Sequence, residues 1–219
     1  MEHVIPQSLG NHNVVLPTGV VCDTCNHGKL SNLDNALIDF TAISLLRTLY
    51  GIPSKSGKPP TTKLSNASLR MTELGKIELE SNSKKAFAYD GKDKMNLQLR
   101  GNRRMTPTYF RTITRALFKM TLGCIYIDLP DVAFSERFDP ICRMILGLDS
   151  FHGYFVASKI TPPTHEGVKL SYRFFKNDQG RRSVFCLFHF LGFEMFTDLE
   201  IRKWQSLPIV PDGFTIREF

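Results

Sequence analysis

Residues 2–34, EHVIPQSLGNHNVVLPTGVVCDTCNHGKLSNLD, constrain the fold of this 219-residue chain more than any other segment. Their apolar runs are short and are interrupted by Gly, Asn and Pro, which predicts two short strands, within HVIP and VVLPTGVVC, joined by a loop. Ser31 or Asn32 then offers a helix N-cap. Apolar residues recur at helical spacing as far as about Tyr50: Leu33, Ala36, Leu37, Phe40 and Ile43. The predicted order is strand, strand, helix.

The same segment carries a concentration of chemically reactive side chains. Glu2 and His3 are adjacent in the first predicted strand. Cys22 and Cys25 have the CxxC spacing of a metal-binding knuckle, and Asn26 follows them directly. The chain holds five cysteines, and an odd number does not favour a framework of disulfides. A role in metal chemistry is therefore the more specific interpretation of the CxxC pair.

The pattern EHVIPxSLG…VVCxxCN…LD resembles the HNH endonuclease superfamily of ββα-metal nucleases. The segments LRTLYG, RALFKMTLG and ERFDPICRMILG further along the chain resemble stretches that accompany this motif in standalone bacterial HNH proteins. The N-terminal match is the specific one, because it includes an acidic-His pair, a Gly turn, a CxxC-Asn and a following helix. The later matches carry no known chemistry.

The resemblance implies a site for phosphodiester hydrolysis. It makes His3 the general base, which suits an imidazole because its ordinary pKa lies near neutrality. It makes Glu2 and Asn26 ligands of one catalytic Mg²⁺ or Mn²⁺ ion, and both offer the hard oxygen atoms that such ions prefer. In many members another Asn holds the loop that carries the base. Asn13 is the first candidate for this role, and Asn11 remains an alternative.

The resemblance also implies a structural zinc site, from which this chain departs. Related sequences commonly carry a first CxxC before the Glu-His pair, whereas this chain begins one residue before Glu2. Cys22 and Cys25 then supply half of a tetrahedral site, and His12 and His27 are poorly spaced to complete it. We expect weak zinc binding and a mobile N-terminus. A late start, a fragment and a degenerate copy all remain open explanations.

Charge favours a polyanionic partner. The chain has 28 Lys and Arg against 21 Asp and Glu, a formal net charge of +7. Thr106 and Pro107 predict the start of a helix, on which Arg111, Arg115 and Lys119 are spaced by four and form one basic ridge, extended backwards by Arg103 and Arg104. The ridge predicts contacts to nucleic-acid phosphates. A solvated helix face is the alternative.

The remaining sequence predicts an α+β protein. Segments KIELE and KAFAYD are expected to pair as a hairpin with MNLQLR beside them, and Asp139 to Gly147 is expected to form a short helix. The last third predicts antiparallel strands in FHGYFVAS, VKLSYRFF and SVFCLFHFLGFEMF. We predict an HNH module over residues 1–50, a linker or basic loop over 51–66, and an α+β domain over 67–219 that could bind substrate.

The predicted function is metal-dependent cleavage of nucleic acid, with DNA as the expected substrate. Two alternatives remain: a nucleic-acid-binding protein with a degenerate, non-catalytic HNH module, and a zinc-knuckle interaction domain. The first residues, MEHVIPQSLG, lack the basic and apolar regions of a signal peptide, and no apolar run has the length of a membrane span. We therefore expect a cytoplasmic protein without membrane partners.

Overall fold

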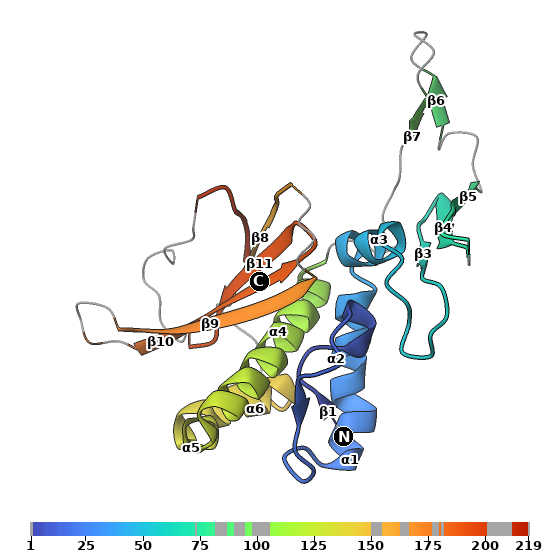
Figure 1. The fold of residues 1–219 in the computed structure, drawn as a ribbon. Helices are drawn as coiled ribbons and strands as arrows, with labels where there is room; N and C mark the ends of the chain where they lie inside the picture. Colours follow the sequence, from blue (N-terminus) through green and yellow to red (C-terminus); the bar gives the residue numbers. More distant parts are fainter. Residues whose placement is uncertain are drawn as a thin grey trace. The chain divides into compact units, whose positions relative to one another are not determined.

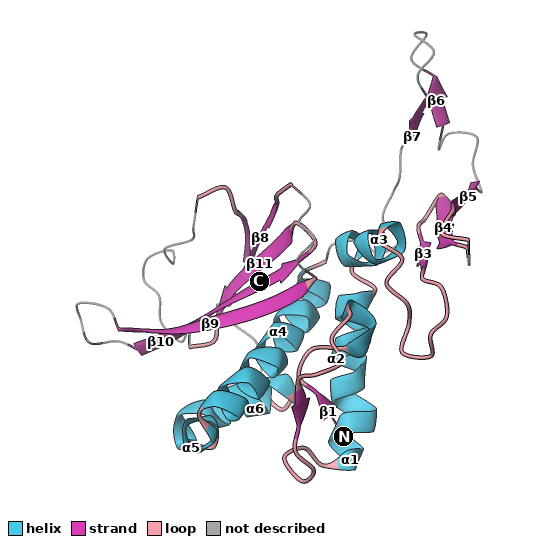
Figure 2. Ribbon diagram, viewed as in Figure 1, coloured by secondary structure: helices cyan, strands magenta, loops and turns pink. Residues whose placement is uncertain are grey.

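The computed structural model describes residues 2–72, 74–81, 87–89, 95–97, 106–149, 155–162, 167–176, 180, 182–200 and 212–218. The chain divides into two compact units, residues 1–37 with 106–219 and residues 38–105. Helices and strands are both abundant, as the α+β prediction requires (Figure 2). The predicted functional division into 1–50, 51–66 and 67–219 remains a prediction. Within the described residues, no helix is both long and apolar enough to cross a bilayer.

The N-terminal hairpin consists of two very short strands. β1 (Glu2–His3) pairs antiparallel with β2 (Val15–Leu16), so that Glu2 faces Leu16 and His3 faces Val15. The loop between them contains one 3-10 turn, η1 (Gln7–Leu9), which ends at Gly10 with φ of 89°. That left-handed conformation favours glycine, which explains the SLG sequence. The two predicted strands are confirmed, although each is only two residues long.

A helical segment follows the hairpin and begins earlier than predicted. α1 (Asp23–Cys25) continues through a π-helical turn, η2 (Asn26–Leu30), into α2 (Ser31–Ile38). Cys22 is the N-cap, because its sulfur accepts a hydrogen bond from the Cys25 backbone N–H at 3.3 Å. The expected cap at Ser31 or Asn32 is therefore wrong. The helix also ends before Tyr50, because Phe40 adopts an extended conformation with ψ of 125°.

The second unit is built from α3 (Thr41–Leu49) and short strands. β3 (Thr61–Lys63), β4 (Ala67–Met71) and β5 (Ile77–Ser81) form one antiparallel sheet, and β6 (Phe87–Tyr89) pairs with β7 (Met95–Leu97). The expected hairpin between KIELE and KAFAYD is therefore wrong. β5 pairs instead with β4, because the turn Thr72–Lys76, with Gly75 at φ of 71°, folds those two strands together.

The long helix α4 (Pro107–Asp128) is the centre of the first unit. Thr106 caps it by accepting a hydrogen bond from the Tyr109 backbone N–H at 3.2 Å, and Pro107 occupies its first turn, as predicted. The predicted apolar face is buried: Phe110, Ile113, Leu117 and Met120. Beyond α4 come α5 (Pro130–Ala133), η4 (Glu136–Phe138) and α6 (Asp139–Ile145), which is the predicted short helix.

A five-stranded sheet completes the first unit. Its order is β12-β8-β11-β10-β9, all antiparallel, formed by β8 (Phe155–Ile160), β9 (Val168–Lys176), β10 (Arg182–Phe190), β11 (Phe193–Asp198) and β12 (Thr215–Glu218). The apolar run SVFCLFHFLGFEMF is two strands rather than one. Leu191 and Gly192, with φ of 50° and 89°, form the tight turn between them.

Helix α4 lies between the sheet and the N-terminal hairpin (Figure 1). On the sheet side it covers the face that carries the buried residues Val184, Cys186, Phe188 and Phe190 of β10. On the hairpin side Gly123 allows a close approach, since a Cβ there would lie 3.0 Å from Val4 Cγ1. One helix therefore positions both parts of the unit.

Candidate functional site

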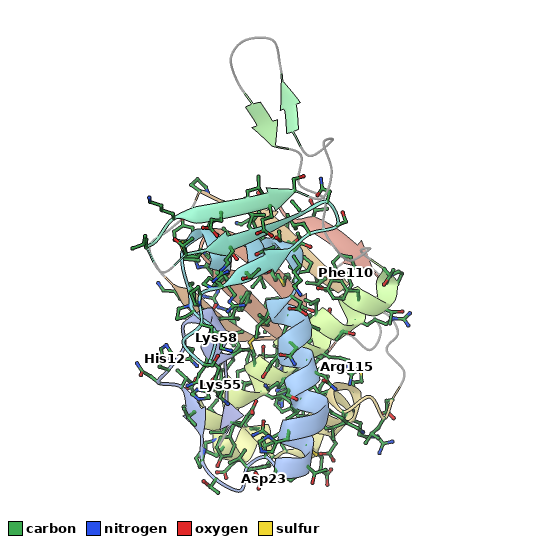
Figure 3. All side chains as sticks on the ribbon, turned by 90° about the vertical axis from the view of Figure 1, so that its right-hand side faces the viewer. His12, Asp23, Lys55, Lys58, Phe110 and Arg115 are labelled. Atoms are coloured by element: carbon green, nitrogen blue, oxygen red, sulfur yellow. The ribbon has the colours of Figure 1, made fainter. Side chains whose placement is uncertain are left out.

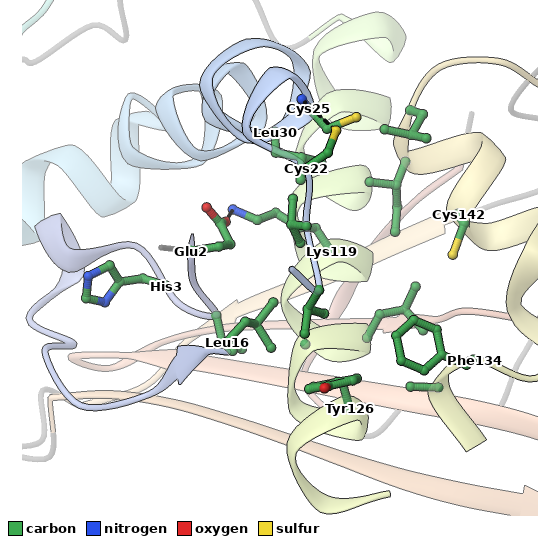
Figure 4. A pocket seen from close by; sticks show the side chains of 18 residues that line it. Glu2, His3, Leu16, Cys22, Cys25, Leu30, Lys119, Tyr126, Phe134 and Cys142 are labelled. Carbon is green, nitrogen blue, oxygen red and sulfur yellow. Dashed lines mark hydrogen bonds and ion pairs between the residues drawn. The ribbon is translucent and has the colours of Figure 1, made fainter. Parts of the chain in front are cut away.

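Glu2 and His3 lie on β1 and differ in their surroundings. Glu2 is 7% exposed, whereas His3 is half-buried. Figure 4 shows the Glu2 carboxylate beside the Lys119 ammonium of α4, with the His3 ring turned away from that pair. Successive side chains of a strand point to opposite faces, so β1 directs Glu2 into the protein and leaves His3 nearer to solvent.

The side chain of Asn11 stabilises the loop that follows β1 through hydrogen bonds. Its amide nitrogen donates to the Ile5 carbonyl at 2.9 Å and to the Val14 carbonyl at 3.3 Å, and its amide oxygen accepts from the backbone N–H groups of Asn13 and Val14. The side chain is buried. These bonds join the end of β1 to the start of β2, so Asn11 sets the shape of the hairpin.

The structure gives these loop-bridging hydrogen bonds to Asn11, the alternative, and the role assigned to Asn13 remains a prediction. Asn13 is exposed, and its backbone N–H donates to Asn11 at 3.3 Å. The spacing of the motif did not distinguish the two residues. Only the Asn that reaches across the loop can bridge the two strands, and that residue lies two positions earlier than expected.

Cys22, Cys25 and Asn26 lie together at the start of the helical segment. The hydrogen bond between the two cysteine side chains lowers the pKa of Cys22, and the same bond raises the pKa of Cys25. Cys22 is exposed and Cys25 is half-buried. Among the described residues, no group of three or more His, Cys, Asp or Glu side chains is arranged to hold a metal ion. The two thiols thus offer two ligands for zinc.

Lys119 extends from α4 to two carboxylates that are remote from it in sequence. Its ammonium pairs with Glu2 and lies 2.7 Å from both carboxylate oxygens of Asp34 on α2. Side-chain exposures are 7% for Lys119, 9% for Glu2 and 20% for Asp34. Burial raises the pKa of Asp34 to about 6, although the Lys119 charge opposes this shift. The three groups form a buried charged cluster that joins β1, α2 and α4.

A cavity of about 270 Å³ lies beside this cluster. Its walls are mostly apolar, and they include Glu2, His3, Cys22, Cys25 and Lys119 (Figure 4). The structure therefore brings five of the predicted site residues to one cavity. Asn26 does not line it.

The predicted basic ridge on α4 is not an exposed surface. Lys119 is buried in the cluster, and Arg115 donates from Nε and Nη2 to the Ile145 carbonyl at 3.2 and 2.6 Å, capping the end of α6. Burial lowers the pKa of Arg115. Arg111 is half-buried, and Arg103 and Arg104 lie outside the described residues. The spacing of four residues correctly predicted that the three basic residues lie on one side of a helix. That side of α4, however, faces the interior of the protein.

The other histidines of the described part of the chain have different surroundings. His12 and His27 are exposed, and the side chain of His12 points away from the ribbon (Figure 3). His189 accepts a hydrogen bond at 3.4 Å from the Gly192 backbone N–H in the turn that follows β10. This hydrogen bond gives His189 a structural role in the hairpin of β10 and β11.

Sequence reasoning identified neither Asp34 as a site residue nor the role of Lys119. Asp34 was visible as the final residue of the LD pair in the motif, which is the one available signal. Lys119 lies 85 residues further along the chain, so its two partners could not be recognised by spacing. Gly123 likewise gave no signal before its approach to Val4 was known.

The donor atoms of Glu2 and Asn26 fit a hard divalent cation, because carboxylate and amide oxygens are its usual ligands. Glu2 offers a buried carboxylate, and Asn26 lies half-buried at the first residue of the π turn. A cation at Glu2 would lie next to the Lys119 ammonium, which already contacts that carboxylate. Asn26 does not share the cavity that Glu2 lines, and Lys119 already neutralises the Glu2 carboxylate, so the arrangement of these residues does not form a metal site by itself.

Comparison with known protein families finds a match at the N-terminus. The family model of the HNH endonucleases matches residues 1–40, the segment that contains the hairpin, the CxxC-Asn and Asp34. No curated protein and no solved structure matches the chain. The resemblance to the HNH endonucleases predicted from the sequence is thereby confirmed for residues 1–40, and it indicates a nuclease-type function in general terms.

Proposed function

We propose that the chain is an endonuclease that hydrolyses phosphodiester bonds with the help of one Mg²⁺ or Mn²⁺ ion, and that DNA is its substrate. The observation that carries this proposal is the bracing of the His3 hairpin by Asn11, whose amide bonds to Ile5, Asn13 and Val14. A general base must be held within hydrogen-bonding reach of the water that it deprotonates. A braced loop beside the half-buried His3 supports this role.

Each residue then has a defined task. His3 takes the proton from the attacking water, and Asn11 holds the backbone that positions His3. Glu2 and Asn26 hold the divalent ion, which when bound supplies positive charge near the developing negative charge on the phosphate oxygens. The positive end of the helix dipole, at the start of the helical segment capped by Cys22, favours a phosphate there.

Only some of the other predicted contacts are kept in the proposed function. Cys22 and Cys25 are proposed as two ligands of a structural zinc ion, since both thiols lie at the start of the same helix. Of the three basic residues of α4, only Arg111 remains a proposed phosphate contact, because Arg115 and Lys119 have partners within the protein. A cytoplasmic location stays a prediction from the sequence.

A plasmid-nicking assay with Mg²⁺ or Mn²⁺ tests the proposal. His3→Ala should reduce the rate on the order of 10²–10⁴-fold while binding of DNA persists, because the base acts on water. Asn11→Ala should also slow cutting, since a displacement of about 1 Å can cost on the order of 10²-fold. Asn13→Ala is the matched control and should cut at the wild-type rate, because only its backbone contacts Asn11.

Two results would overturn the assignment. Undiminished cutting by His3→Ala would remove the general base from the proposal. Binding of DNA without any cutting by the wild-type protein, with either ion, would favour the non-catalytic alternative, and absence of both activities would favour an interaction domain.

A further inference from the structure

The five-stranded sheet has an outer face, opposite to the one that α4 covers (Figure 1). Side chains alternate along a strand, so the odd-numbered residues of β9 and β10 lie on this outer face, where Arg173 is paired with Phe185 and Ser171 with Leu187. Phe175 and Leu187 are 37% and 36% exposed, and Ser171 and Arg173 are also exposed. Part of the outer face is therefore open to solvent.

A row of four aromatic rings crosses the outer face from strand to strand. Ring centroids are 5.6 Å apart for Phe175 and Phe185, 5.2 Å for Phe185 and Phe196, and 6.2 Å for Phe196 and Phe214. The Lys159 ammonium lies 4.6 Å from the centroid of the Phe214 ring. Phe196 is buried, whereas the other three rings keep part of their surface exposed. The row therefore offers ring surface to a flat ligand.

The exposed charge described on the outer face is positive. Lys169 and Arg173 of β9 are exposed. Of the carboxylates described there, Glu194 is paired with Lys159 at 3.0 Å and Asp198 is fully buried. This local excess agrees in sign with the net charge of +7 of the whole chain. A surface that combines aromatic rings with positive charge suits a polyanion that also carries flat groups.

The outer face is hollowed, and the hollow region extends to the N-terminal hairpin. One hollow of about 360 Å³ is lined by three rings of the row and by two basic side chains of the face. A second, of about 820 Å³, is lined by Ile5 and Val14 of the hairpin together with residues of β9 and β10. Ser171, Leu187 and Glu194 line both, so the two hollows adjoin.

We propose that the outer face binds single-stranded DNA, with bases stacked on the exposed rings of the aromatic row and phosphates beside Arg173. The choice of DNA rests on the proposed function, whereas the stacking does not. Bases in a duplex are stacked on one another and cannot lie on protein rings, so the row selects unpaired bases. A strand that follows both hollows passes from the sheet to the hairpin that carries His3.

Fluorescence anisotropy on the full chain tests the proposal. The probe is a labelled DNA strand of about 12 nucleotides, a length typical of such binding surfaces. EDTA in the buffer prevents metal-dependent cutting, so binding is measured alone. The wild type should bind the strand roughly tenfold more tightly than the duplex of the same sequence, since stacking of one base contributes on that order.

Two pairs of substitutions distinguish the two faces of the sheet. Phe175→Ala should weaken binding of the strand roughly tenfold. Phe174→Ala is its matched control, because Phe174 is adjacent, also 37% exposed and on the opposite face, and it should bind nearly as the wild type does. Arg173→Gln should lower the slope of the salt dependence by about 0.7, whereas Arg182→Gln, on the opposite face of β10, should not. All four side chains are exposed, so the variants should keep the fold.

Several outcomes would overturn the inference. Equal affinity for the strand and the duplex, equal losses in Phe174→Ala and Phe175→Ala, or no binding of the strand would each do so, and tighter binding of the RNA strand would overturn the choice of DNA. The nicking assay separates this failure from that of the proposed function. Binding that depends on Phe175 in a wild type that cuts with neither ion refutes the nuclease alone, whereas cutting without such dependence refutes the outer face alone.

Discussion

The five-stranded sheet and the N-terminal hairpin pack against the two sides of helix α4 through different contacts. On one side the five-stranded sheet packs apolar residues of long, regularly paired strands against the helix, as with Val184, Phe188 and Phe190. On the other side the hairpin has strands of only two residues, and it buries Val4, Ile5, Leu9 and Leu16 beside the Lys119 ion pairs. Apolar burial therefore stabilises both sides, and the hairpin side adds a charged cluster whose groups lose solvation when they are buried.

The largest expected effect is on the sheet side. Phe188 is fully buried, and Phe188→Ala should reduce the free energy of unfolding by about 3–5 kcal/mol, because it removes apolar contacts and leaves a cavity. Leu187 is the matched control: it is adjacent in β10, points to the opposite face and is 36% exposed. Leu187→Ala should cost about 1 kcal/mol or less in urea unfolding. Equal losses for the two variants would contradict the comparison.

A buried carboxylate of the sheet should give a pH-dependent effect of intermediate size. Burial raises the pKa of Asp198 to about 6, despite hydrogen bonds from Ser183 and from the Glu200 backbone N–H at 2.9 Å. The folded state therefore holds the proton more tightly than the unfolded state, in which the pKa is near 3.8. The stabilisation is complete below about pH 4 and is lost as the pH rises through about 6.

Asp198→Asn removes this titration and tests it directly. At pH 7.5 the variant should be more stable than the wild type by about 3 kcal/mol, since the pKa rises from 3.8 to about 6 and one pKa unit corresponds to about 1.4 kcal/mol. Below about pH 4 the two proteins should have similar free energies of unfolding. Parallel pH profiles between pH 4 and 8 would show that ionised Asp198 carries no penalty.

The smallest expected effect concerns the hairpin side. Gly123→Ala gains about 1 kcal/mol of helix propensity, but its methyl group would lie 3.0 Å from Val4 Cγ1, and such overpacking costs about 1–3 kcal/mol. A net loss of about 1 kcal/mol follows. A double-mutant cycle with Val4→Ala should show favourable coupling of about 1 kcal/mol, because the smaller side chain makes room. Additive effects would place the hairpin further from α4 than we describe.

Local signals in the sequence predicted the regular elements well. Thr106 and Pro107 located the start of α4, and the apolar spacing along it identified its buried face. The start of the first helix was missed because Cys22, not a common capping residue, fills the cap position. The Leu191–Gly192 turn was missed because Leu191 adopts a positive φ that apolar residues rarely take.

The candidate site was predictable in its N-terminal half only. Glu2, His3, Cys22 and Cys25 were found from the motif and line one cavity in the structure. The choice between Asn11 and Asn13 needed the hairpin geometry, because both lie in the same loop. The burial of Lys119 was not predictable, because its fourfold spacing with Arg111 and Arg115 describes a helix face without saying what covers that face.

The position of Lys119 in the chain has a consequence during protein synthesis. Glu2 and Asp34 leave the ribosome first, and the lysine that neutralises them follows 85 residues after Asp34. At elongation rates of about 5–20 residues per second, that interval lasts roughly 4–17 s. Throughout it the nascent N-terminal segment carries two carboxylates without their internal counterion and cannot dock against α4. The N-terminal hairpin is therefore synthesised before α4, but it can pack against α4 only after that helix has emerged from the ribosome.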